Sequence, residues 1–89
     1  MRAVITVIGK DVVGILARVS SICAENGVNV IEVTQSVLQE FFAMIMMVDL
    51  NASKIPVSEL SDKLSSLEGE MGLKIHVMHE DIFNSMHKI

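Results

Sequence analysis

The stretch AVITVIGKDVVGILARVSSICAENGVNVIEV, residues 3–33, carries three different sequence patterns in a row. Residues 3–8 are rich in Val, Ile and Thr, which is typical of a β-strand. Apolar residues then recur at helical spacing, and they are Ile15, Leu16, Val19, Ile22 and Cys23. Gly27 ends this pattern, because glycine readily adopts the left-handed conformation that closes a helix. A strand, a helix and the start of a second strand are therefore predicted.

The next two segments predict strands joined by a tight turn at Gln39 and Glu40. Residues 28–38 alternate between two sets of side chains. One face is expected to hold Ile31, Val33, Gln35 and Val37, and the other, more polar face Val30, Glu32, Thr34 and Ser36. Residues 41–50 form a nearly continuous apolar run, which predicts a strand covered on both faces.

The rest of the chain predicts a helix, a strand and a short tail. Pro56 suits the first turn of a helix, where its missing N–H costs little. The apolar stripe of this helix consists of Val57, Leu60, Leu64, Leu67 and Met71, and it ends at Gly72. Residues 73–78 alternate as a fourth strand. The tail, residues 80–89, is an amphipathic segment with Ile82, Phe83, Met86 and Ile89 at helical spacing.

The order strand, helix, strand, strand, helix, strand predicts an α+β fold of the ferredoxin-like βαββαβ type. Such a sandwich has one four-stranded antiparallel sheet with two helices on one face, and here a short C-terminal helix is added. The first and third strands are central in this topology, and they are the two with apolar residues on both faces. We expect one domain over residues 1–79, followed by the helix or tail over residues 80–89.

One face of the predicted sheet is left without helices. Its apolar members are expected to be Val4, Ile8, Ala43, Ile45 and Met47. A small domain that is 51% hydrophobic must cover such residues or present them to a partner. The tail helix, from the same chain or from a second copy, is the nearest candidate, and a homodimer is therefore expected.

The bulk composition excludes several classes of protein. The net charge of −4 disfavours nucleic-acid binding, and no Trp or Tyr is present to stack on bases. Cys23, the single cysteine, excludes an internal disulfide and fits a reducing compartment. No signal peptide is visible, and no apolar run approaches the roughly 20 residues that span a bilayer. We expect a cytoplasmic protein without a membrane partner.

The sequence holds no recognisable catalytic or metal site. No phosphate-binding loop or Ser/His/Asp order is present, so we expect no enzyme activity and no cofactor. His76 and His79 are three residues apart on a strand, which puts them on opposite faces and argues against a shared metal. Cys23 lies on an apolar stripe and is interpreted as a buried small hydrophobe.

The turn over residues 9–14 is the best candidate for a binding site. Backbone N–H groups at a helix start are unpaired, and the helix dipole favours an anion such as a carboxylate there. Each residue also has a simpler explanation. Asp11 could cap the helix, Gly14 could serve helix–strand packing, and Asn29 could bind its own backbone. Asn29 is expected beside this turn, where its amide could offer a ligand both a hydrogen-bond donor and an acceptor.

The segment resembles the ACT domain, a small regulatory fold that binds amino acids in many metabolic enzymes and regulators. The matching residues are Asp11, Gly14, Ile15 and Leu16, followed by Gly27, Val28, Asn29 and Val30. The chain looks like the stand-alone single-ACT proteins of bacteria and is similar to the ACT modules of the glycine-cleavage regulatory protein. The resemblance implies a ligand site formed by Gly9, Lys10, Asp11, Val12, Val13, Gly14 and Asn29.

The function expected from this resemblance is that of a small regulatory module. Two chains would bind an amino acid or related metabolite between the turn of one chain and the start of the second strand of either chain. The signal would then pass to a separate partner protein. The alternative is a ligand-free dimerisation or scaffold module in which the turn is purely structural.

Overall fold

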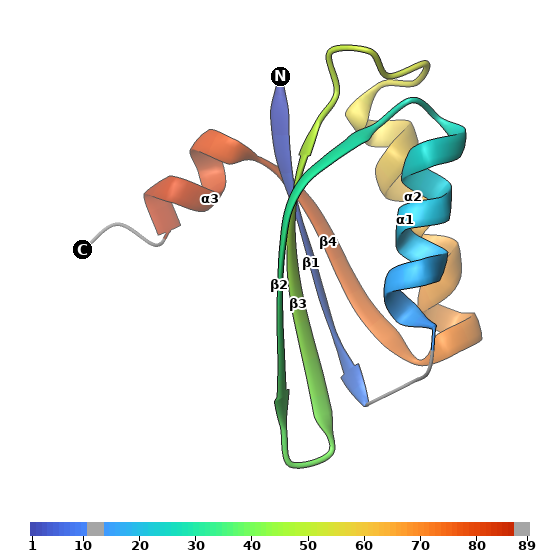
Figure 1. Cartoon of the computed structure of the whole chain (residues 1–89), viewed down its shortest axis with the longest axis vertical. Helices are drawn as coiled ribbons and strands as arrows, with labels where there is room; N and C mark the ends of the chain where they lie inside the picture. Colours follow the sequence, from blue (N-terminus) through green and yellow to red (C-terminus); the bar gives the residue numbers. More distant parts are fainter. Residues whose placement is uncertain (11–13, 87–89) are drawn as a thin grey trace.

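The computed structural model describes residues 1–10 and 14–86, shown in Figure 1. The strands are β1 (Arg2–Lys10), β2 (Asn29–Leu38), β3 (Phe41–Asp49) and β4 (Leu73–His79). The helices are α1 (Ile15–Glu25), α2 (Val57–Met71) and α3 (Glu80–Met86). The predicted order of elements is confirmed.

The four strands form one antiparallel sheet in the order β2-β3-β1-β4. The predicted ferredoxin-like sheet, with the first and third strands at its centre, is therefore confirmed. Helices α1 and α2 lie on one face of the sheet, and α3 lies on the other side (Figure 1). We call the face under α1 and α2 the inner face and the opposite face the outer face.

The hydrophobic core fills the space between the inner face and the two long helices. The central strands contribute Ala3, Ile5, Val7, Phe42, Met44, Met46 and Val48. The helices contribute Ile15, Val19, Cys23, Leu60, Leu64 and Leu67. The helical stripes read from the sequence thus face the core as predicted. A pair between Arg18 Nη2 and Glu70 Oε1, 2.9 Å apart, joins α1 to α2 at the surface.

The end of α1 depends on a glycine. Gly27 has a φ of 73°, and the N–H of the next residue, Val28, donates to the carbonyl of Cys23 at 2.8 Å. A Cβ on Gly27 would lie only 2.7 Å from the carbonyl oxygen of Ala52. Conformation and space therefore both require glycine here, in agreement with the predicted helix end.

The predicted faces of β2 are wrong at its start. A β-bulge interrupts the pairing of β2 with β3 between Val30 and Glu32. Because a bulge inserts one extra residue, Val30 and Val33 both pack against the core, and Ile31 is 46% exposed. Simple alternation assigned Val30 and Val33 to opposite faces.

The prediction that β3 is covered on both faces is also wrong for the single chain. Phe41 is 51% exposed and Ile45 is 41% exposed, whereas Met44 and Met46 between them are buried. Register places Ile8 of β1 directly beside Ala43 of β3. We call the exposed apolar residues Ile8, Phe41, Ala43 and Ile45 the outer patch.

Helix α3 protects only part of the outer face. Arg2 Nη2 lies 2.9 Å from Glu80 Oε2, which ties the start of α3 to β1. Val4 is 1% exposed, whereas Ile8, on the same face of the same strand, is 53% exposed. None of the described helices is long and apolar enough to cross a membrane.

Candidate ligand sites

The predicted turn joins the end of β1 to the start of α1. Gly9 pairs with Phe42 on one side and Leu73 on the other, and Lys10 is the exposed last residue of β1. Gly14 immediately precedes α1. Asp11, Val12 and Val13 lie outside the described residues, so the predicted cap and carboxylate contacts there stay predictions. The described members of the turn lie at one end of the sheet.

Gly14 adopts a left-handed backbone conformation immediately before α1. Its φ is 87°, and its carbonyl accepts the first helical hydrogen bond, from the N–H of Arg18 at 2.9 Å. A Cβ built on Gly14 would meet no atom of the described residues within 4 Å. The interpretation of Gly14 as a helix–strand packing residue is therefore wrong, and its backbone conformation is what requires glycine.

Gly9 is the turn glycine that packs closely. A Cβ there would lie 2.6 Å from Leu73 Cδ2 and 3.2 Å from the carbonyl oxygen of Gly72. The absence of a side chain at Gly9 therefore allows β1 to pass the start of β4. This structural reason accounts for Gly9 without a ligand.

Asn29 does not lie beside the turn within one chain, contrary to expectation. Asn29 pairs with Asp49, and Asp49 pairs with Arg2 at the start of β1. The turn follows Lys10 at the other end of β1, eight residues further along the strand, or about 26 Å at 3.3 Å per residue. The first and second strands run parallel, so their starts share one end of the sheet. Only a second copy could bring Asn29 to the turn.

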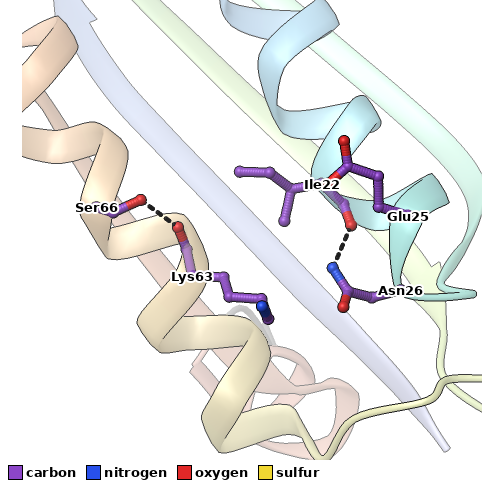
Figure 2. A pocket seen from close by; sticks show the side chains of 5 residues that line it. All are labelled: Ile22, Glu25, Asn26, Lys63 and Ser66. Carbon is purple, nitrogen blue, oxygen red and sulfur yellow. Dashed lines mark hydrogen bonds between the residues drawn. The ribbon is translucent and has the colours of Figure 1, made fainter.

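A groove of about 550 Å³ lies between α1 and α2 (Figure 2). It is lined by Ile22, Glu25, Asn26, Lys63 and Ser66. The Nδ2 of Asn26 donates to the carbonyl of Ile22 at 2.7 Å, and the Oγ of Ser66 donates to the carbonyl of Lys63 at 2.6 Å. These donors are thus engaged with their own helices, and the charges of Glu25 and Lys63 are what the groove offers a ligand.

Sequence reasoning missed this groove. Lys63 and Ser66 are three residues apart in α2, so the sequence could have indicated that these two polar side chains are neighbours on the surface of that helix. Their proximity to the last turn of α1 depends on how the two helices pack, and periodicity contains no information on that.

A second space, of about 300 Å³, lies between α3 and the outer face and is mostly apolar. We call it the α3 notch. Its lining side chains include Ile8, Ala43, Ile45, Met78, Phe83 and Met86, together with the polar residues Thr6 and His76. The notch therefore includes three members of the outer patch.

The sequence predictions for histidine concern metal binding, and the prediction for Cys23 concerns its burial. Within residues 1–10 and 14–86, no three His, Cys, Asp or Glu side chains are grouped closely enough to hold a metal ion. The Nδ1 of His79 accepts a hydrogen bond from the N–H of Asp81 at 3.0 Å. Cys23 is fully buried, as predicted, and burial raises the pKa of its thiol to about 11. At neutral pH it is a protonated core residue and not a nucleophile.

Comparison with known proteins supports the resemblance. The family model described as "ACT domain" matches residues 2–78. A UPF0237 protein of Clostridium acetobutylicum is 44% identical over 89 residues, covering 100% of both chains. A solved ACT domain protein from Streptococcus pneumoniae is 36% identical, with a TM-score of 0.79 and coverage of 93% of both chains. The ligand-free regulatory subunit of aspartate kinase from Thermus thermophilus is 28% identical, with a TM-score of 0.66, and the match covers 85% of this chain and 49% of that one.

Proposed function

Because the chain belongs to the ACT domain family, whose members are generally regulatory modules that bind small ligands, we propose that it binds an amino acid or related metabolite. The ligand site lies between two copies of the chain, and binding is transmitted to a separate partner protein in the cytoplasm. The chain itself is not an enzyme in this proposal.

The observation that carries the proposal is the open start of α1. Gly14 is exposed, has a φ of 87° and has no described atom within 4 Å of where a Cβ would lie. The N–H groups of the first helical turn have no partners within the helix, and the helix dipole adds partial positive charge. An α-carboxylate is an anion of the size and charge that suits such a position.

The same geometry explains why two copies are needed. Asn29 starts β2, which is an edge strand of the sheet. If two β2 strands associate antiparallel across a two-fold axis, the start of one lies beside the end of the other. The end of β2 is level with the end of β1, because Leu38 and Lys10 both pair with Phe41. The partner's Asn29 is thereby brought to the end of the sheet that carries the turn.

Transmission follows from linkage. A ligand that contacts two copies favours the arrangement in which both contacts form. It shifts the equilibrium toward that arrangement by its difference in affinity for the two states. The partner protein would distinguish these two arrangements.

The proposal is tested by thermal unfolding of the purified protein against each of the amino acids. A ligand at about 100 times its Kd stabilises the folded state by roughly 2.7 kcal/mol, a shift of several degrees in a domain of this size. We expect one amino acid to raise Tm in the wild type and to lose that effect in Asp11→Ala and Asn29→Ala. The control Asn84→Ala removes an exposed amide from α3 and should keep the shift. A shift that survives in Asn29→Ala would contradict the shared site.

The alternative is a ligand-free association module, and the outer patch is the observation that favours it. Four apolar residues lie together on an uncovered sheet face, as expected of a surface built to associate. If no amino acid shifts Tm and the chain still associates, the alternative is supported.

A further inference from the structure

Two sets of oppositely charged residues lie along the line where α1 and α2 meet. Arg18 of α1 and Glu70 of α2 form an ion pair, with Nη2 and Oε1 2.9 Å apart. Glu25 of α1 and Lys63 of α2 line the groove between the same helices. Their charged groups form no ion pair or hydrogen bond with any of the described residues. The contact between the helices is therefore closed by charge at one end and open at the other.

The open end combines two opposite charges with an apolar surface. Glu25 is the last residue of α1, and Lys63 lies in the middle of α2. Figure 2 shows the side chains of Ile22 and Lys63 pointing into the space between the two helices. Ile22 packs partly against the core, so its remaining surface gives the groove an apolar side. These groups share one space of about 550 Å³.

Glu25 is unfavourable for the helix that carries it. The C-terminal end of a helix has partial negative charge, which repels a carboxylate and favours a cation. The last turn of α1 has no basic residue to offset Glu25. Folded proteins break such local rules mainly at functional or strained sites. The carboxylate of Glu25 and the end of α1 together favour a cationic group of a ligand.

The other polar atoms of the groove add acceptors. The Nδ2 of Asn26 already donates to the carbonyl of Ile22, which leaves the Oδ1 of Asn26 as an acceptor. The hydroxyl of Ser66 donates to the carbonyl of Lys63, so its oxygen can still accept. Among the described side chains of the groove, the Lys63 ammonium is the donor without a partner. A fitting ligand therefore brings several N–H donors and one anionic group.

We propose that this groove binds a zwitterionic amino acid with an apolar side chain. The ammonium of the ligand lies against Glu25 and Asn26, and its carboxylate lies against Lys63. Its side chain packs on Ile22. The two charges of the groove cancel, so a ligand with a single charge gains at one of them and loses at the other. A zwitterion in the matching orientation gains at both.

This site is separate from the ligand site proposed above. It is formed within one chain and lies at the C-terminal end of α1, whereas the turn with Gly14 precedes the other end. It needs neither Asp11 nor Asn29, so Asn29→Ala should leave binding in the groove unchanged. Either site can fail without the other.

The test is a titration of the isotopically labelled protein, followed by the chemical shifts of its backbone amides. The probes are L-valine, L-leucine, L-isoleucine, L-methionine and L-phenylalanine, each added to about 10 mM, which nearly saturates a site with a Kd of about 1 mM. We expect at least one of them to give saturable shifts centred on Ile22, Asn26 and Ser66. Saturable shifts from none of these amino acids, or shifts centred on Gly9 and Gly14 instead, would overturn the proposal.

Analogues of the bound amino acid test whether the groove recognises both charges. For leucine they are isoamylamine, which lacks the carboxylate, and isocaproate, which lacks the ammonium. We expect each analogue to bind about tenfold more weakly than the amino acid, or less, because one charge-assisted contact is lost. An analogue that binds as tightly as the amino acid contradicts recognition of a zwitterion.

Charge-removing variants assign the two contacts. Lys63→Gln and Glu25→Gln should each weaken binding about tenfold or more. The controls Lys74→Gln and Glu59→Gln remove exposed charges of the same sign elsewhere and should bind like the wild type. Because Glu25→Gln also removes the repulsion at the end of α1, the free variant should unfold at a higher temperature than the wild type. Unchanged binding by Lys63→Gln or by Glu25→Gln would overturn the assignment.

Discussion

Ile45 and Met46 are neighbours in the same strand, yet Met46 is fully buried and Ile45 is 41% exposed. Met46 points to the inner face, where α1 and α2 complete a core. Ile45 points to the outer face, where one short helix covers only part of the sheet. The two side chains are similar in size and hydrophobicity. Their different burial teaches that an apolar strand residue is buried only where the fold, or a second chain, supplies a covering layer.

The largest expected effect is the loss in free energy of unfolding when an isoleucine of the inner face is truncated, and it is compared with the same truncation on the outer face. Ile5→Ala removes a fully buried side chain from the inner face and should lower the free energy of unfolding by about 2–5 kcal/mol. Ile45→Ala should cost less than about 1 kcal/mol in dilute solution, where chains are separate. Urea unfolding at low protein concentration measures both. Equal losses would show that the outer face is already covered within one chain.

A second test uses the Cys23 thiol, which lies in the core between the inner face and the two long helices. The pKa of the buried Cys23 thiol is raised from 9.0 to about 11, so the unfolded chain loses this proton first as pH rises. The thiol therefore contributes full stability below about pH 9, and that contribution declines between pH 9 and 11. Thermal unfolding across this range should show a steeper loss in the wild type than in Cys23→Ala. Parallel curves would mean that the thiol is hydrated.

The smallest expected effect concerns the ion pair that fixes α3 over the outer face. Glu80→Gln removes the charge that faces Arg2 at 2.9 Å. Because the Arg2 side chain is 47% exposed, solvent screens the pair, and the loss should be under about 1 kcal/mol. Hydrogen exchange at the amides of α3 should nevertheless accelerate, because that helix has few other contacts. Unchanged exchange would show that the apolar contacts of Phe83 and Met86 suffice to hold it.

Most of the fold could be predicted because local patterns and topology agree. The spacing of the α1 stripe, the glycine at 27 and the alternation of β4 each point to the element that the structure shows. The alternation of β2 from Glu32 to Val37 was predicted correctly, but the face of Val30 relative to those residues was not, because the bulge between Val30 and Glu32 leaves no clear mark on the local sequence. A single inserted residue reverses the faces of those that follow it.

The candidate site was predictable only in part. The turn around Gly14 follows from the sequence, because a glycine between a strand and a helix has a local meaning. The separation of Asn29 from that turn depends on strand order and direction, which place the starts of β1 and β2 at the opposite end of the sheet.

The sequence by itself determined the elements, the helical stripes that face the core and the family, since these depend on residue spacing and type. Only the tertiary structure decided which apolar residues are covered, where Asn29 lies and what α3 leaves open. Those properties depend on which segments meet across the sheet, and a side chain's own hydrophobicity does not specify its neighbour.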